Sequence, residues 1–188
     1  MNKFQNKYRI GSARLPNWDY RSNADYFVTI CTKNRKCFFG EITDSQKDNP
    51  MTLSKIGQIA QDLWEGIPNH FPDIKLGEFV VMPNHVHGIV EIKKSKGDLG
   101  DVDDRDVACN VSTQKNQMQD ISPKKGALST IIRSYKSAVT KNARLTNPHF
   151  AWQSRFYDHV IRNPSAFNKI SNYIINNPKN WDTDKFYS

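Results

Sequence analysis

The chain has few cysteines, no long apolar segment and no apolar N-terminal stretch, and each absence excludes a class of protein. Three cysteines occur in 188 residues, and no two of them form a C-x-x-C pair. This sparse set excludes a disulfide scaffold and a zinc ribbon, and it favours a reducing compartment. No apolar run is longer than about five residues, whereas a membrane-spanning helix needs about 20. The polar N-terminus contains no secretory signal, so we expect a cytoplasmic protein.

Basic side chains outnumber acidic ones, which indicates an anionic partner. The chain carries 27 Lys and Arg residues against 19 Asp and Glu residues, which gives a net charge of +8 and a pI near 9.4. Nucleic acid is the first partner that such a balance favours, and an acidic membrane surface is the second. Five aspartates lie within residues 98–106, and without them and Arg105 the rest of the chain carries +12.

Composition predicts one domain with three accessory segments. Residues 1–24 form a basic arm with interspersed aromatic side chains, and residues 25–182 form the domain itself. Within the domain, residues 93–126 have few large apolar side chains and many acidic ones, which is typical of a mobile insertion. Residues 183–188 are expected to be a tail.

The spacing of apolar residues predicts a ferredoxin-like α+β fold. Strands are expected over residues 26–32, 77–82, 85–92 and 156–162, and helices over residues 52–67, 127–144 and 163–177. This order is β-α-β-β-α-β followed by a C-terminal helix, so we expect an antiparallel sheet with helices packed on it. Asn163 and Pro164 suit the start of the C-terminal helix, because Asn caps helices and Pro fits their first position.

Two histidines at the start of a predicted strand are candidate metal ligands. His85 and His87 are two residues apart, so their side chains point to the same face of the sheet, about 6–7 Å apart along the strand. Two neutral imidazoles can share one divalent metal. The pair follows a Pro-Asn turn, so we expect both rings to face an open site and their replacement to cost little stability. The alternative is an ordinary half-buried pair with no metal.

The C-terminal helix can supply further groups to such a site. Tyr173 and Asn177 are four residues apart and therefore lie on one face of the helix. If this helix crosses the sheet near the histidines, Asn177 offers a carbonyl oxygen to the metal, and Tyr173 offers a hydroxyl to the metal-bound group. Alternatively, Tyr173 belongs to the apolar stripe of the helix. Tyr157 and His159 in the preceding strand are rival candidates, for which strand alternation favours a structural role.

Basic and aromatic side chains outside this cluster are candidates for DNA contacts, because cations neutralise phosphates and aromatic rings stack on bases. The candidates are Arg14, Arg133, Lys136, Arg155, Arg162 and Lys179, with Trp181 as a stacking residue.

Four blocks of the sequence, in this order, resemble the REP-associated tyrosine transposases, which are single-tyrosine transposases within the His-hydrophobic-His endonucleases. The blocks are YFVTICT at residues 26–32, VVMPNHVHG at residues 80–88, WQ followed by FYDHVIRN at residues 152–163, and YI followed by NP at residues 173–178. The resemblance implies that His85 and His87 bind a divalent metal, Mg²⁺ first and Mn²⁺ second. It also implies that Tyr173 is the nucleophile and that Asn177 completes the metal site.

The activity implied by the resemblance is metal-dependent cleavage and rejoining of single-stranded DNA at hairpin-flanked sites. Tyr173 would form a 5′-phosphotyrosine intermediate. The protein would act as a monomer or a homodimer. It would associate with the nucleoid through DNA and would not bind a membrane. Two alternatives stay open from the residues. One is a non-enzymatic ferredoxin-like module that binds single-stranded nucleic acid. The other is a metal hydrolase in which water attacks in place of tyrosine.

Overall fold

A computed structural model describes residues 3–4, 7–8, 15, 18–43, 50–94 and 126–187. The predicted arm is therefore described only in part, and Arg14 and almost all of the predicted insertion at residues 93–126 lie outside the described residues. Two short strands of the arm, β1 (Lys3–Phe4) and β2 (Lys7–Tyr8), pair with each other.

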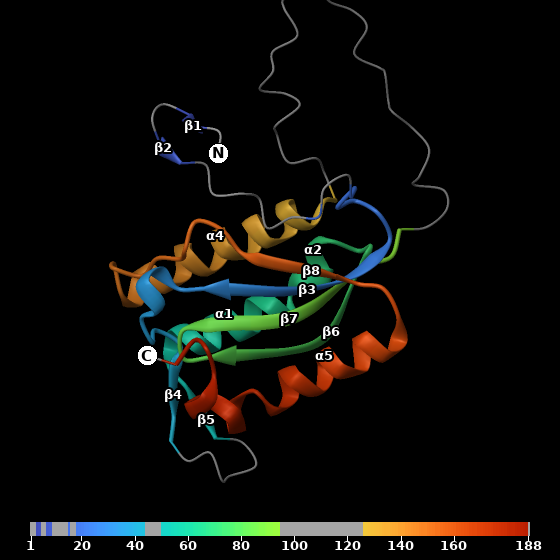
Figure 1. Ribbon diagram of the computed structural model, residues 1–188. Helices are drawn as coiled ribbons and strands as arrows, with labels where there is room; N and C mark the ends of the chain where they lie inside the picture. The colour runs from blue at the N-terminus through green and yellow to red at the C-terminus, as the bar shows by residue number, and fades with distance from the viewer. Residues whose placement is uncertain are drawn as a thin grey trace, which may run out of the picture.

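A four-stranded antiparallel sheet forms the centre of the domain (Figure 1). Its strands are β3 (Ala24–Cys31), β6 (Ile74–Met82), β7 (His85–Ile92) and β8 (Tyr157–Ile161). They lie in the order β6-β7-β3-β8, and every neighbouring pair is antiparallel. With a helix after the first and third of these strands along the chain, this is the predicted ferredoxin-like plan, and the prediction is confirmed.

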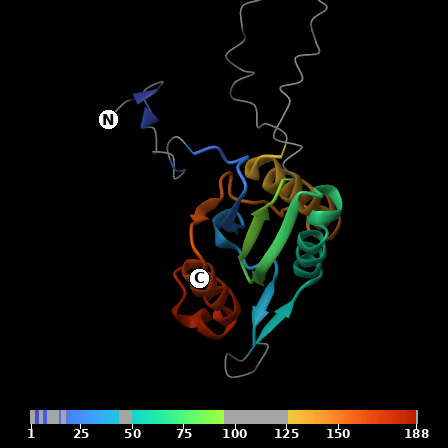
Figure 2. The same ribbon diagram turned by 90° about the vertical axis from the view of Figure 1, so that its right-hand side faces the viewer.

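Helices cover both faces of the sheet (Figures 1 and 2). The helices α1 (Lys55–Glu65) and α4 (Leu128–Thr146) pack together on one face, and α5 (Pro164–Asn176) packs against β6 and β7 on the other. The remaining elements are η1 (Lys33–Arg35), β4 (Gly40–Ile42), β5 (Met51–Leu53), α2 (Ile67–His70) and η2 (Pro178–Thr183). None of the described helices combines the length and apolar character needed to span a bilayer.

The first predicted helix is displaced at both ends, the second differs by one or two residues at each end, and the C-terminal helix starts as predicted. The first helix begins at Lys55 rather than at residue 52, because Met51–Leu53 pairs with β4 as strand β5. The Ser54 side chain caps α1 by accepting a hydrogen bond from the Gly57 N–H. The helix then ends at Glu65, not at residue 67. The C-terminal helix starts as predicted, with the Asn163 side chain accepting from the Ala166 N–H at 2.8 Å.

Alternation along β7 separates the main core from the site. Val86 and Val90 face α1 and α4 and belong to the main hydrophobic core. Ile89 faces α5 and belongs to a second, smaller core with Ile161 and Ile174. His85 and His87 have the parity of Ile89, so both point to the α5 face.

A close contact between α1 and β7 lies on the face of the sheet opposite the histidines. The buried indole of Trp64 lies directly over Gly88, where an added Cβ atom would come within 2.3 Å of Cζ2 of the indole. Only glycine allows this approach, so the residue after His87 is chosen by helix packing rather than by the site.

We expect Gly88→Ala to lower the free energy of unfolding by about 1–3 kcal/mol, because the new methyl group overpacks the core against a rigid indole. Urea unfolding followed by tryptophan fluorescence measures this change. Gly66→Ala is the control, since a Cβ atom at Gly66 would lie 3.3 Å from the Asp62 carbonyl oxygen, a much smaller overlap than the one at Gly88. Equal stability of Gly88→Ala and the wild type would show that Trp64 can move aside without loss.

Candidate active site

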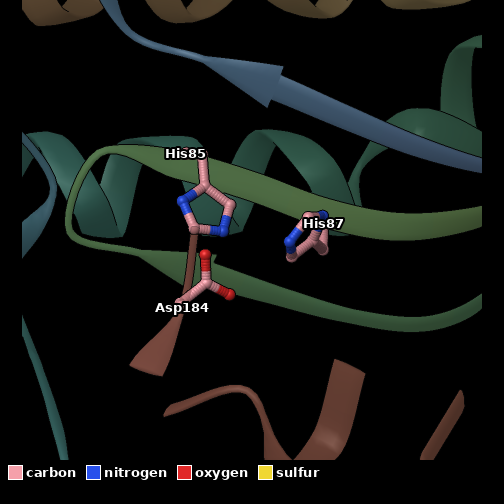
Figure 3. A group of neighbouring side chains, drawn as sticks. All are labelled: His85, His87 and Asp184. Atoms are coloured by element: carbon pink, nitrogen blue, oxygen red, sulfur yellow. The ribbon is translucent and has the colours of Figure 1, made fainter. Parts of the chain in front are cut away.

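The two histidines lie side by side at the start of β7, with ring centroids 4.4 Å apart (Figure 3). The expectation of an open site is wrong, because His85 and His87 are only 0% and 1% exposed. The C-terminal residues fold back over them, and the Phe186 ring centroid lies 4.6 Å from that of His85 and 5.8 Å from that of His87. Replacing either histidine is therefore expected to cost stability as well as function.

The orientation of each imidazole is set by a hydrogen bond at Nδ1. His85 Nδ1–H donates to Asn84 Oδ1 at 2.8 Å, and His87 Nδ1 lies 2.9 Å from Thr29 Oγ1. The Asn84 amide nitrogen donates to the carbonyl oxygens of Arg35 and Phe186, which leaves Oδ1 as the acceptor for His85. His85 therefore carries its proton on Nδ1, and its Nε2 has a free lone pair. That atom is buried and has no hydrogen-bond partner among the described residues.

Both histidines are neutral at neutral pH. Burial lowers the pKa of His85 to about 3, and the positive charges of Lys185 and Arg35 act in the same direction. Burial also lowers the pKa of His87 well below its ordinary value of 6.5, with a further contribution from His85. Neutral imidazoles with Nε2 facing inward are the form that binds metals.

Two oxygen-bearing side chains reach the histidines from the C-terminal part of the chain. Asp184, beyond η2, belongs with His85 and His87 to a cluster whose ligand atoms all lie within 4.8 Å of one another (Figure 3). The Asn177 amide nitrogen donates to Asp184 Oδ2 at 2.9 Å. The other end of that amide, Asn177 Oδ1, is buried and has no hydrogen-bond partner among the described residues.

The hydroxyl of Tyr173 lies at the edge of this cluster. It is 3.3 Å from Nε2 of His87, and it donates to Asp184 Oδ2 at 3.4 Å. Burial, followed by the negative charge of Asp184, raises the pKa of Tyr173 to about 12. The side chain is nevertheless 42% exposed, so a ligand in solvent can reach it. Tyr173 is thus more than part of the apolar stripe of α5.

The arrangement fits a divalent metal. Two buried acceptors, Nε2 of His85 and Oδ1 of Asn177, have no hydrogen-bond partner among the described residues, which is costly unless a cation or water engages them. Nε2 of His87 and the Asp184 carboxylate complete a set of two nitrogen and two oxygen donors. Such a mixed set suits several divalent cations.

The predicted DNA contacts are distributed over both faces of the domain. Arg133 and Lys136 lie on α4, on the face of the sheet opposite the histidines. Arg155 and Arg162 are exposed and flank β8, and Lys179 is exposed and lies in η2. Trp181 is not an open stacking residue, because it is only 6% exposed and its ring centroid lies 6.1 Å from that of His85. Trp181 therefore packs against the site.

The rival candidates lie beside the cluster rather than in it. Tyr157 is 49% exposed, and its ring contacts that of Phe27. His159 is exposed and pairs with Phe27 across the β3–β8 register.

Three residues of the site, Asn84, Thr29 and Asp184, are not predicted from the sequence. The sequence does indicate two of them, because Asn84 precedes His85 and Thr29 pairs with His87 once β3 is placed beside β7. Asp184 carried no such signal, because it fell in the supposed tail at residues 183–188, and no local spacing relates it to residues about one hundred positions earlier.

Comparisons with known proteins agree with this fold. No model of a known protein family matches the chain. An uncharacterized protein from Haemophilus influenzae is 39% identical over 191 residues, which cover 96% of this chain and 97% of that protein.

Solved structures are similar at lower identity. The structure of a REP-associated tyrosine transposase bound to a REP hairpin matches with a TM-score of 0.50 and 19% identity, over 95% of this chain and 73% of that one. A candidate transposase from Deinococcus radiodurans R1 matches with a TM-score of 0.45 and 12% identity, over 90% of this chain and 97% of that one. The chain thus belongs to the same family as the Haemophilus influenzae protein, and its fold is that of the REP-associated tyrosine transposase.

Proposed function

We propose that the chain is a metal-dependent endonuclease and strand transferase that acts on single-stranded DNA. The observation that carries this proposal is the position of the Tyr173 hydroxyl, 3.3 Å from Nε2 of His87. This hydroxyl adjoins a cluster in which His85 Nε2 and Asn177 Oδ1 are buried without hydrogen-bond partners among the described residues. A nucleophile beside a set of metal ligands is the arrangement that phosphodiester cleavage needs.

The proposed metal ligands are Nε2 of His85, Nε2 of His87, Oδ1 of Asn177 and one oxygen of Asp184. Mg²⁺ is the first candidate and Mn²⁺ the second. A divalent cation here would polarise a non-bridging phosphate oxygen. It would also offset the negative charge of Asp184, which favours the protonated form of Tyr173. Thr29 and Asn84 keep both imidazoles pointing at the cation through their contacts with Nδ1.

Tyr173 carries the covalent step of the proposed reaction. Its phenolic oxygen attacks the phosphorus, a bond between this oxygen and phosphorus forms, and the bond from phosphorus to the 3′ oxygen breaks. The phenolic proton passes to Asp184 Oδ2, its hydrogen-bond acceptor, and the departing 3′ oxygen takes up a proton from solvent water to give a free 3′-OH. The product is a 5′-phosphotyrosine link, which keeps the bond energy, so a second 3′-OH can reverse the step and join the strand.

The net charge and the structural neighbour support DNA as the substrate. The chain carries +8, and exposed arginines stand at both ends of β8. The REP-associated tyrosine transposase of the same fold is bound to a REP hairpin. We therefore propose that this chain acts on single strands beside DNA hairpins in DNA transposition.

Tyr173→Phe should reduce covalent adduct formation to background, because it removes only the nucleophilic oxygen and leaves the ring in α5. The assay incubates the protein with Mg²⁺ or Mn²⁺ and single-stranded DNA from the flanks of its own gene, then detects an adduct that resists SDS. Tyr187→Phe is the matched control, since Tyr187 is an exposed tyrosine of the C-terminal segment. We expect DNA binding to persist in both variants.

Other outcomes of this assay would reassign the chemistry. An adduct formed by Tyr173→Phe but lost in Tyr157→Phe would make Tyr157 the nucleophile. Cleavage without any adduct would favour attack by water. Tight binding without metal and without cleavage in the wild type would instead indicate a non-enzymatic nucleic-acid-binding module.

Asp184→Asn should weaken metal binding by about tenfold or more, because the cluster loses its negative charge while the side chain keeps its size. Titration calorimetry with Mn²⁺ measures this change, and EDTA should abolish adduct formation in the wild type until Mg²⁺ or Mn²⁺ is restored. Asp182→Asn, an exposed carboxylate two residues earlier, is the control. Unchanged affinity in Asp184→Asn would remove Asp184 from the ligand set.

DNA binding should weaken steeply as salt increases and should favour a hairpin with a single-stranded flank over plain duplex. Each phosphate contact on a single strand contributes a slope of about −0.7 to a plot of the logarithm of the association constant against that of the salt concentration. Arg162→Gln should therefore make the slope shallower by about 0.7, whereas Lys141→Gln on α4 should not change it. Fluorescence anisotropy measures both values. Salt-insensitive binding would contradict a phosphate-based interface.

A further inference from the structure

Two aromatic side chains of the β3–β8 half of the sheet adjoin Tyr173. The helix α5 packs mainly against β6 and β7, and Phe27 of β3 and Ile161 of β8 pack with its Ile174 in the smaller core. Beyond Phe27, toward the edge of the sheet, Tyr157 of β8 is 49% exposed. The Phe27 ring centroid is 6.2 Å from that of Tyr173 and 6.4 Å from that of Tyr157, with an edge-to-face arrangement in both pairs. We call Phe27 and Tyr157 the aromatic platform.

The two rings of the platform differ in exposure. Phe27 is partly buried, packs with the smaller core and stacks on His87 of β7 with a centroid distance of 5.3 Å. Tyr157 is anchored in β8, opposite Thr29 of β3, and is 49% exposed. Because the Tyr157 ring already packs edge-to-face against Phe27, it loses less side-chain freedom when a flat ligand stacks on it than a ring without such a contact would.

Two cations lie near the ends of the strand that carries Tyr157. The strand β8 lies at one edge of the sheet, and exposed guanidinium groups stand just before and just after it, at Arg155 and Arg162. Aromatic rings between cations are the pattern that holds single-stranded nucleic acid, because the rings stack on bases while the cations contact phosphates. An apolar protein partner would not need the flanking cations.

We propose that the aromatic platform stacks on an unpaired base of the DNA strand close to the phosphate that Tyr173 attacks. This inference rests on the proposed function. Since Phe27 contacts both tyrosines, the stacked base lies within about two nucleotides of the attacked phosphate. The platform thereby selects unpaired over paired DNA at the cleavage point, because a base within a duplex already stacks on its neighbours.

The test compares two labelled 12-nucleotide probes in EDTA, so that binding is measured without cleavage. One probe is oligo(dT), and the other has the same backbone with abasic sites throughout. Fluorescence anisotropy should show that the wild type binds oligo(dT) about tenfold or more tightly than the abasic probe. Tyr157→Ala should lose at least about fivefold of this preference and keep its affinity for the abasic probe. Tyr157→Phe should keep the preference, because the ring remains.

Three results would overturn the platform. Tyr157→Ala could bind oligo(dT) as tightly as the wild type, Tyr157→Phe could lose as much preference as Tyr157→Ala, or affinity for both probes could fall equally. Ile175→Ala, an exposed apolar side chain on α5, is the control and should behave as the wild type. Adduct formation by the wild type separates the two proposals. If the wild type forms an adduct and Tyr157→Ala keeps the preference for oligo(dT) over the abasic probe, only the role of the platform is wrong. If the wild type forms no adduct, the proposed function is wrong.

Discussion

The antiparallel register between β3 and β7 is the constraint on which the site depends. It places Thr29 opposite His87, and that pairing gives the imidazole its partner at Nδ1. A slip of one residue would turn both histidines toward α1 and α4 and bring Gly88 to the other face. The register is held by alternating apolar residues and by the fit of Trp64 over Gly88. The main core on one face thus determines which side chains stand on the other.

The second half of the site comes from the end of the chain. The helix α5 supplies Tyr173, its C-terminal cap supplies Asn177, and the segment after η2 supplies Asp184. These groups contact one another as well as the histidines, since Asp184 Oδ2 accepts from both Tyr173 and Asn177. Phe186 of this segment packs against both imidazoles, and burial lowers the pKa of each. The segment that supplies Asp184 thus also contributes to the burial of the histidines.

Local patterns in the sequence were sufficient for the fold and for part of the site. The strand β7, the start of α5 at Asn163 and Pro164, and the strand order follow from alternation, capping and known connection rules, all of which act over short distances. The burial of the histidines could not be predicted, because it depends on Phe186, about one hundred residues later. Asp184 was missed for the same reason. The start of α1 was misplaced because the apolar residue Leu53 fits both a helix and the strand it forms.

The hydrogen bonds of Asn84 show how strongly the hairpin turn is tied to its surroundings. Its amide nitrogen donates to the carbonyl oxygens of Arg35 and Phe186, and its amide oxygen accepts from His85. Aspartate has almost the same shape and is equally common in turns, but it would set a carboxylate oxygen against two carbonyl oxygens. The side chain at position 84 must therefore donate hydrogen bonds from one end and accept one at the other. This requirement, and not the conformation of the backbone, selects asparagine at this turn position.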